Sequence, residues 1–336
     1  MYNPSAVGKK GTIFGLPYGV GEADLVFIPV HQDVTTSFVD GTSKSPDIIL
    51  QESTQIDLSL PQIEKPWELK MAMDDRLVPK GQNEIFRGRA KNVIAALEKG
   101  KIPDQEQVAF VNDWCSNICD LVESRSIQLL EEDKIPAVIG GDHASPLGLI
   151  KALAKTQSFG ILQIDAHMDL RDTYEGFEYS HASIMNKALE NPSISKLVQV
   201  GIRDFCEEEE RVVQKAKGRI MVYYDEKIFQ DKQEGSSWFQ QCSDIIEHLP
   251  AFVYVSFDLD GLEPSLCPCT GTPVPGGLQF YEAVTLMERV VQSGRIIIGF
   301  DVCEAGPKPW DANVAARIIY RIATLAGVSK SLLEFR

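Results

Sequence analysis

The chain lacks a surplus of basic residues, paired CxxC motifs of zinc-site spacing and any apolar run long enough to span a membrane. Its 336 residues carry 33 Lys and Arg against 48 Asp and Glu, which gives a formal net charge of -15. This balance argues against a protein that binds nucleic acid through the phosphate backbone, so we expect no nucleic-acid partner. The negative charge is compatible with a cationic substrate, but a soluble, self-repelling surface explains it equally simply.

The missing apolar segments also bear on the compartment. The longest runs, such as Ile296 to Ile298, have the length of strands, far below the roughly 20 residues of a membrane span. The start of the sequence shows no apolar core of a secretory signal. The seven cysteines are an odd number without the spacing of a zinc site. We therefore expect a cytoplasmic protein with reduced cysteines and without membrane contact. The two thiols of Cys267 and Cys269 have no further metal-binding residue nearby in sequence, so they are weak evidence for a metal site.

What the sequence does contain is an alternation of short apolar segments with segments of helical periodicity. Strands are predicted over 23–30, 135–140, 159–165, 196–202, 219–224, 252–258 and 295–301. Helices are predicted near 106–133, 145–155, 207–216, 236–248, 279–292 and 311–326. Strands that are apolar throughout are typical of a parallel sheet covered on both faces. The predicted fold class is α/β, with a doubly wound, mostly parallel sheet and helices on both faces.

Domain organisation follows from the same pattern. We expect residues 1–336 to form a single domain that includes an N-terminal extension over 1–20. Residues 53–105 are rich in Pro, Lys and Gln, show no clear strand, and are interpreted as an excursion over the surface. The acidic run from Glu207 to Glu210 directly follows a strand, so it is interpreted as the first turn of a helix, where the helix dipole favours negative charge. We expect this run to be solvated.

Four polar clusters each lie at the carboxyl end of a predicted strand, which is where open α/β sheets bind their ligands. They are Gly140–His143, Asp165–Asp169, Ser256–Gly261 and Asp301–Glu304. Side chains alternate between the two faces of an extended segment, so Asp165, His167 and Asp169 point to one side. Asp258 and Asp260 share a side for the same reason.

Four carboxylates at neighbouring strand ends would repel one another, and most would have to take up protons. Two divalent cations remove this difficulty, because they balance the four aspartates and leave neutral His143 and His167 to complete the ligands. Such oxygen-rich ligation suits Mn(II), while Zn(II), Fe(II), Co(II) or Ni(II) are chemically possible. Taken alone, an Asp-x-Asp motif at a strand end is more often a helix N-cap or a solvated loop, and Gly-Gly-Asp-His could be a turn followed by a helix cap. Two of the five histidines lie inside these acidic motifs, which favours a metal site.

His181 lies in a short loop downstream of Asp169. From its position it either moves protons at the site or has no part in the chemistry.

These motifs resemble the ordered motifs of the ureohydrolase superfamily, which comprises arginases, agmatinases, formiminoglutamases and related guanidino hydrolases. The similar segments run along nearly the whole chain and include GGDH, DAHMDLR, SFDLDGLEP, Thr270–Pro273 and Gly276–Gly277. DAHMDLRDTYEGFEYSHAS and VGIRDFCEEEE are most similar to agmatinases. The resemblance implies the three-layer fold of arginases and deacetylases, and an assembly of trimers or hexamers.

The resemblance also implies two metal ions in each chain, most simply Mn(II). One ion would be bound by His143, Asp165, Asp169 and Asp258. The other would be bound by Asp165, His167, Asp258 and Asp260, so that Asp165 and Asp258 bridge the two.

The implied reaction is attack on a guanidinium carbon by a hydroxide formed between the two ions, which releases urea and an amine. Asp169 would pass a proton toward the leaving amine, and His181 matches a histidine that assists proton transfer. Glu304 matches the acidic position that helps to hold the guanidinium group. A small cationic guanidino compound is thus the expected substrate.

Departures from the family patterns bear on which compound this is. Arginases recognise the amino-acid end of arginine through an Asn directly after the metal motif, where this chain has Leu170–Asp172. Many agmatinases have an Arg in the loop after the first strand, where this chain has Asp40, which we expect at the rim of the substrate site. Agmatine, cleaved to putrescine and urea in polyamine metabolism, is the expected substrate. Guanidine, guanidinobutyrate, guanidinopropionate and formiminoglutamate stay open, as do a one-metal deacetylase and a non-catalytic ligand-binding regulator.

Overall fold

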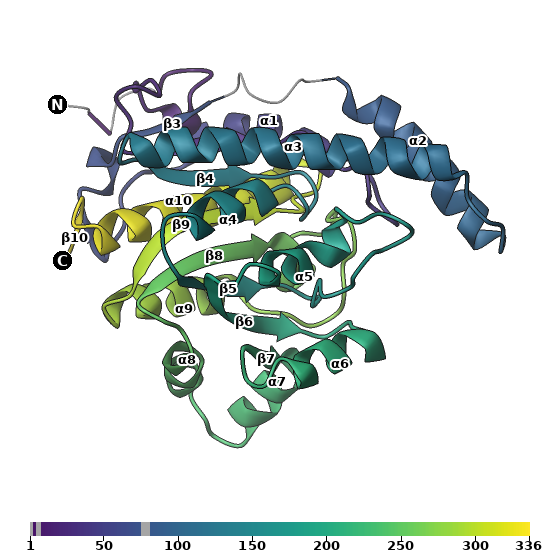
Figure 1. Cartoon of the computed structure of the whole chain (residues 1–336). Coiled ribbons are helices and arrows are strands. Elements are labelled where there is room, and N and C mark those ends of the chain that lie inside the picture. The colour runs from purple at the N-terminus through teal and green to yellow at the C-terminus, as the bar shows by residue number, and fades with distance from the viewer. Residues whose placement is uncertain (1–2, 5–7, 75–80) are drawn as a thin grey trace.

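A computed structural model describes residues 3–4, 8–74 and 81–336. An eight-stranded sheet passes through the centre, in the order β3-β1-β4-β9-β8-β5-β6-β7 (Figure 1). Every neighbouring pair in this sheet is parallel. Its strands are β1 (Leu25–Pro29), β3 (Met71–Met73), β4 (Ile135–Ile139), β5 (Phe159–Ile164), β6 (Ile194–Ile202), β7 (Ile220–Tyr224), β8 (Phe252–Asp258) and β9 (Ile296–Cys303).

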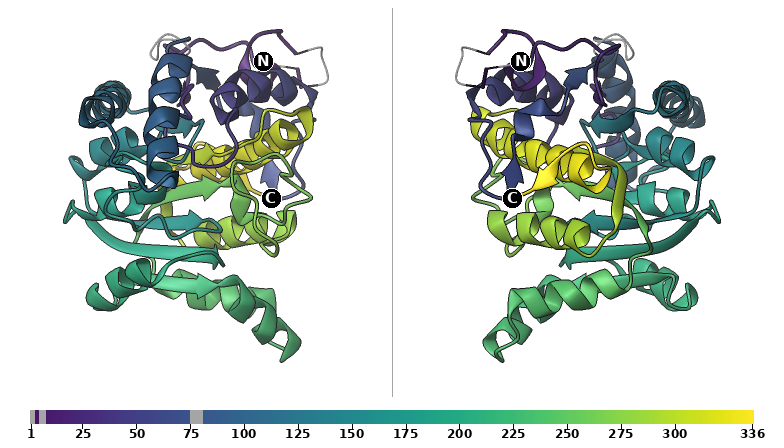
Figure 2. Two further views of the ribbon diagram at one scale, coloured as in Figure 1. Left: turned by 90° about the vertical axis from the view of Figure 1, so that its right-hand side faces the viewer. Right: turned by 90° about the vertical axis from the view of Figure 1, so that its left-hand side faces the viewer.

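Helices cover both faces of this sheet (Figure 2). The apolar cluster on one face includes residues of α1 (Ser45–Glu52), α7 (Asp225–Gln233), α8 (Trp238–Glu247), α9 (Phe280–Gln292) and α10 (Pro309–Ser329). The cluster on the other face includes residues of α3 (Gln105–Glu131), α4 (Leu147–Ala154) and α5 (Ile184–Leu189), with α6 (Glu207–Lys215) packed at its border. Strands β4 and β5 are buried along their whole length. This explains their largely apolar sequences, because each face of the sheet contacts a helical layer.

The prediction of a mostly parallel, doubly wound α/β sheet is confirmed. All seven predicted strands and all six predicted helices occur, with ends that differ by a few residues. The short strands β2 (Ile63–Glu64), β3 and β10 (Glu334–Phe335) and the helices α1, α2 (Asn83–Glu98), α5 and α7 were not predicted. These elements are short or carry weak apolar periodicity, and packing against other elements stabilises them, such as α10 for α1, α3 for α2 and α4 for α5.

Residues 53–105, in which the sequence shows no clear strand, contain two short strands. Within this segment β3 forms an edge of the central sheet, and β2 (Ile63–Glu64) pairs antiparallel with β10 (Glu334–Phe335). Helix α2 packs along α3 in a hairpin. Strands of two and three residues are too short for a period to be detected. Residues 75–80 of this segment lie outside the described residues.

The predicted N-terminal extension contributes to the core where the structure describes it. Phe14 is buried, and its ring lies 5.0 Å from that of Tyr320 in α10. Residues 1–2 and 5–7 of the extension lie outside the described part. Within the described residues, no helix combines the length and hydrophobicity that crossing a membrane requires.

Candidate metal centre

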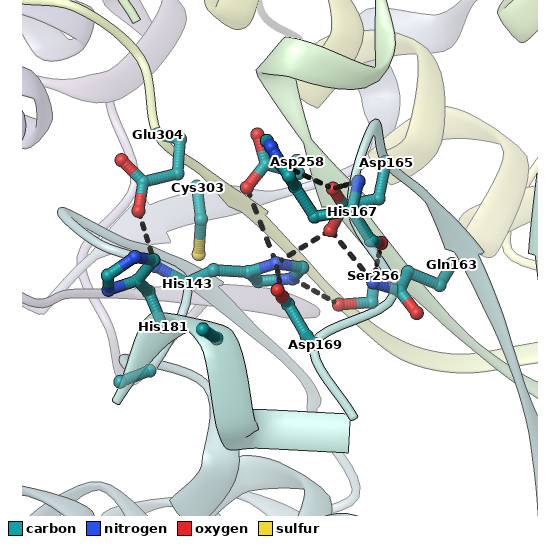
Figure 3. A network of polar contacts seen from close by, with 12 residues as sticks. His143, Gln163, Asp165, His167, Asp169, His181, Ser256, Asp258, Cys303 and Glu304 are labelled. Carbon is teal, nitrogen blue, oxygen red and sulfur yellow. Dashed lines mark hydrogen bonds and ion pairs between the residues drawn. The ribbon is translucent and has the colours of Figure 1, made fainter. Parts of the chain in front are cut away.

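The polar clusters converge because β4, β9, β8 and β5 are consecutive in the sheet and all end at the same edge. His143 follows β4, Asp165 follows β5 directly, and Asp258 is the last residue of β8. Their side chains point toward one another in a network (Figure 3). The network also includes Asp169, His167 and Glu304.

One group of ligand atoms surrounds Nδ1 of His143. Carboxylate oxygens of Asp165, Asp169 and Asp258 lie 3.0, 2.9 and 3.3 Å from this nitrogen. Nδ1 is buried and makes no hydrogen bond of good geometry to any described residue. A nitrogen that faces three carboxylates in this way is arranged as one corner of a cation site.

The other ring nitrogen of His143 fixes its tautomer. Ser256 donates its hydroxyl proton to Asp301 Oδ2 over 2.8 Å, so its oxygen must accept the contact of 2.9 Å with His143 Nε2. Tyr254 donates to the same Asp301 oxygen. Nε2 therefore carries a proton in neutral His143, and the lone pair of Nδ1 is directed at the carboxylates. This is the state that a metal-binding histidine requires.

A second group of ligand atoms surrounds Nδ1 of His167. This nitrogen lies 3.1 Å from Asp260 Oδ2 and 3.6 Å from Asp165 Oδ1. The two oxygens of Asp165 thus face different histidines, and the two sets of atoms that could hold a metal ion share this residue. Asp258 directs Oδ2 to the first group, while its Oδ1 accepts the backbone N–H of Asp260.

Charge in this cluster needs compensation, because all four aspartates are buried. Burial and the neighbouring Asp165 raise the pKa of Asp169 to about 7. Burial and the neighbouring carboxylates also raise the pKa of Asp258 well above its ordinary value. Burial opposes the positive charge of His167, yet Asp260 and Asp165 raise its pKa to about 12. Without metal the cluster therefore retains protons, which divalent cations displace on binding. The residues present fit two such ions.

Glu304 lies directly after β9 with one oxygen engaged and one free. Oε1 accepts the backbone N–H of His143 over 2.9 Å, while Oε2 is buried and has no hydrogen bond to a described residue. Both Glu304 and Asp169 adopt left-handed backbone angles, with φ of 58° and 54°. Such angles are uncommon outside glycine and concentrate at functional sites.

A cavity of about 340 Å³ opens beside the cluster. His167, Asp169 and His181 line it, together with Phe38 from the loop after β1. The ring of His181 packs edge-to-face against Tyr174 at 5.8 Å. Burial and the nearby His167 lower the pKa of His181 to about 3, so this imidazole is neutral at pH 7. The structure thus brings His181 to the cluster.

Asp40, expected at the rim, is not brought to this cavity. It forms an ion pair with Lys91 of α2, and its carboxylate lies 3.8 Å from Arg87 Nε. The hydrogen bond from Lys91 lowers the pKa of Asp40 despite partial burial. Asp40 lines a separate depression between its loop and α2. Cys267 belongs to neither ligand group, and its buried thiol donates to the carbonyl of Leu259.

The expectation that Glu207–Glu210 is solvated was wrong for Glu209. This carboxylate is buried and accepts the backbone N–H of Leu170 over 3.1 Å and that of Cys206 over 3.0 Å. It thereby joins the start of α6 to the loop that carries Asp169. The signal was a Glu three residues after the N-cap, but Cys206 instead of Ser or Thr hid the capping box.

Comparison with known proteins connects this geometry to a family. The family described as Arginase matches residues 23–325. The chain belongs to the arginase family. It is 30% identical over 330 residues to the N(1)-aminopropylagmatine ureohydrolase of Thermus thermophilus, covering 97% of this chain and 96% of the relative. The N(1)-aminopropylagmatine ureohydrolase of Synechocystis is 27% identical over 290 residues, covering 85% of this chain and 82% of the relative.

Solved structures agree on the fold of this arginase-family chain. Proclavaminate amidino hydrolase from Streptomyces clavuligerus superposes with a TM-score of 0.74, covering 95% of this chain and 97% of its own at 23% identity. Together with the family match, this identifies a ureohydrolase, a metal-dependent hydrolase that acts on guanidino C–N bonds. The family implies a binuclear divalent metal centre, and the two His–Asp groups could hold it.

Proposed function

We propose that this chain releases urea from a small cationic guanidino compound, with agmatine as the first candidate. The observation that carries the proposal is the pair of buried His–carboxylate groups that share Asp165. Glu304 adds a buried carboxylate oxygen without a hydrogen bond from a described residue. A planar guanidinium group is a natural partner for such an acceptor, because it presents several N–H donors in a fixed geometry.

The proposed ligand sets extend the two groups, with Asp169 added to the first and Asp258 to the second. His143, Asp165, Asp169 and Asp258 would hold one ion, and Asp165, His167, Asp258 and Asp260 the other. Carboxylate oxygens with two imidazoles suit Mn(II), while Ni(II) or another first-row metal is chemically compatible. When bound, two such ions lower the pKa of water and stabilise negative charge that develops on the substrate.

The chain's own residues would bind the substrate and move its protons. Glu304 Oε2 would accept guanidinium N–H groups and orient the carbon toward the aspartates. Asp169 lies 2.9 Å from His143 in the first group and also lines the cavity, so it would pass a proton toward the leaving amine. His181, neutral and in the same cavity, would assist this transfer at the side that faces solvent.

The substrate's far end would face the cavity mouth. Asp204 and Arg171 both line the cavity, and the Asp204 side chain is the more exposed of the two, at 68% against 34%. The exposed carboxylate of Asp204 would favour an amine tail, as in agmatine. The names of the two relatives above make the aminopropyl derivative of agmatine a second candidate, because it presents the same guanidinobutyl end. Guanidine, guanidinobutyrate, guanidinopropionate and formiminoglutamate are the remaining alternatives.

Two further readings of the sequence are less well supported. A one-metal deacetylase would need a single Asp-His-Asp set and would leave His143 and Asp260 without a role, although each belongs to a ligand group. A non-catalytic regulator would not need both groups. We also propose that the chain forms one cytoplasmic domain that assembles as a trimer or hexamer.

The test is urea release by the purified protein loaded with Mn(II), with Ni(II) in parallel. The substrates are agmatine, its aminopropyl derivative and the alternatives above, with arginine as a comparison and formamide measured for formiminoglutamate. Urea from agmatine or its derivative, in preference to arginine, supports the proposal. Absence of urea and formamide from every compound with either metal overturns it.

A further inference from the structure

Two buried glutamines interrupt the apolar core of the central sheet. Gln163 lies near the end of β5 and Gln199 lies opposite it in β6, as a directly paired position in the parallel ladder. Both are fully buried. An amide in such a place is costly unless it is hydrogen-bonded, so its partners explain why it is there.

All the amide donors of this pair are directed toward the candidate metal centre. Gln199 Nε2 donates to Gln163 Oε1 and to the carbonyl of Met168, each over 2.7 Å. Gln163 Nε2 donates to Asp165 Oδ2 over 2.8 Å and to the carbonyl of His167 over 3.3 Å. Figure 3 shows Gln163 beside the carboxylate of Asp165. The two side chains form a chain of hydrogen bonds from β6 to the loop after β5.

These contacts fix the groups that the two ligand sets share. Asp165 Oδ2 is the oxygen that faces His143, while Asp165 Oδ1 accepts the backbone N–H of His167 over 2.6 Å. Both oxygens of the shared carboxylate are therefore oriented by the protein. The carbonyl contacts at residues 167 and 168 hold the backbone between His167 and Asp169, one residue from each set.

Hydrogen bonding between Gln163 and Gln199 does not by itself explain why two amides are buried here. Oε1 of Gln199 is buried and accepts no hydrogen bond from a described residue, so the amides leave one acceptor unsatisfied while every donor is used. Two apolar side chains would fill the same space in the sheet without that cost. The arrangement is explained if the donors are required at the loop.

We propose that Gln163 and Gln199 are positioning residues that set the metal affinity of the centre. The inference rests on the proposed binuclear site. Partners that orient metal ligands typically contribute 10- to 100-fold in metal affinity. The hydrogen-bond chain from Gln199 through Gln163 to Asp165 is called the relay below. Because Asp165 belongs to both ligand sets, removing the relay weakens the binding of both ions. Gln199 acts on Asp165 through Gln163, so the effects of the two residues are coupled.

The experiment measures Mn(II) binding to metal-free, folded protein by calorimetry, with circular dichroism to verify the fold. Gln163→Met and Gln199→Met keep an unbranched side chain and remove the donors. We expect each to weaken binding roughly 10- to 100-fold, and the double variant to weaken it by less than the product. Gln163→Asn retains the amide but shortens its reach, so we expect a smaller loss of Mn(II) affinity. It replaces Gln163→Met in the test if the methionine variant does not fold.

Gln241 offers a matched control. It is a buried glutamine in α8 that donates to the carbonyl of Ile228, away from both ligand sets. Gln241→Met should lower the melting temperature while Mn(II) affinity stays at the parent value. Excess Mn(II) should restore urea release in the Gln163 and Gln199 variants, which a merely structural defect would not allow.

The outcomes separate two failures. Parent protein that binds two ions, with folded Gln163→Met, Gln199→Met and Gln163→Asn variants of unchanged affinity, overturns the relay and leaves the proposed function intact. Parent protein that binds no Mn(II) overturns the metal centre, and the relay with it. Weakened Mn(II) affinity in the Gln163 and Gln199 variants, with unchanged affinity in Gln241→Met, supports the inference.

Discussion

Glu209 connects the loop of the metal centre to helix α6, and replacing it tests whether this connection stabilises the site. In Glu209→Ala the backbone N–H groups of Leu170 and Cys206 lose their acceptor. A hydrogen bond to a charged group contributes about 1.5 to 3 kcal/mol. The two distances of 3.1 and 3.0 Å are not short, so we take the lower figure for each bond.

The expected loss is about 3 kcal/mol in the free energy of unfolding. For a chain of this length it corresponds to a melting temperature lower by about 4 °C. Leu170 follows Asp169 directly, so we also expect Mn(II) affinity to fall, roughly 10-fold, because a ligand loop loses its support. Thermal and urea denaturation measure the first quantity, and calorimetric titration with Mn(II) the second.

Glu208 provides the control on the same helical turn. It carries the same charge near the N-terminus of α6 but is exposed. Glu208→Ala removes only a favourable interaction with the helix dipole, which contributes about 0.3 to 1 kcal/mol. Equal stability losses in Glu208→Ala and Glu209→Ala would refute the argument, because they would reduce Glu209 to one more charge at a helix end.

Three further predictions concern residues of the site and its rim. Asp258→Ala should lower the metal content of purified protein, measured by mass spectrometry, as well as urea release; full metal content would contradict its role as a ligand. His181→Ala should keep metal content near the parent value while turnover falls at least about 100-fold, and unchanged turnover would remove His181 from the reaction. Asp40→Asn should leave urea release unchanged and lower stability by less than about 1 kcal/mol, because the pair with Lys91 is exposed. The pKa of Asp40 is lowered from its ordinary 3.8, so its charged form stabilises the folded protein. The stability difference between parent and Asp40→Asn should therefore be present at pH 7 and disappear as the pH falls through the lowered pKa. A stability difference that does not change with pH would contradict this prediction.

The central sheet and the neighbourhood of the ligands could be predicted from the sequence because both depend on strong local patterns. Strands such as β4 and β5 are buried on both faces, so their apolar runs mark them clearly. Parallel strands end at one edge, so the polar residues that follow them had to converge. His143, Asp165 and Asp258 do come together there, within 3.3 Å of one nitrogen.

Other features depend on contacts between distant segments, which local patterns do not contain. Edge strand β3 has three residues and is held by its pairing with β1. Glu209 resembles its exposed neighbours in sequence and differs only through the backbone groups of Leu170 and Cys206. Asp40 was expected at the substrate rim because of its place in the loop after β1, but α2, a helix that was not predicted, supplies the Lys91 that pairs with it.

Metal stoichiometry tests the central claim most directly. The protein is loaded with Mn(II), freed of loose metal, and assayed for bound metal per chain and for urea release from agmatine and its aminopropyl derivative, before and after chelation. We expect two ions per chain, loss of urea release when they are removed, and recovery when Mn(II) is returned. Full activity with a single ion per chain, or with none, would contradict it.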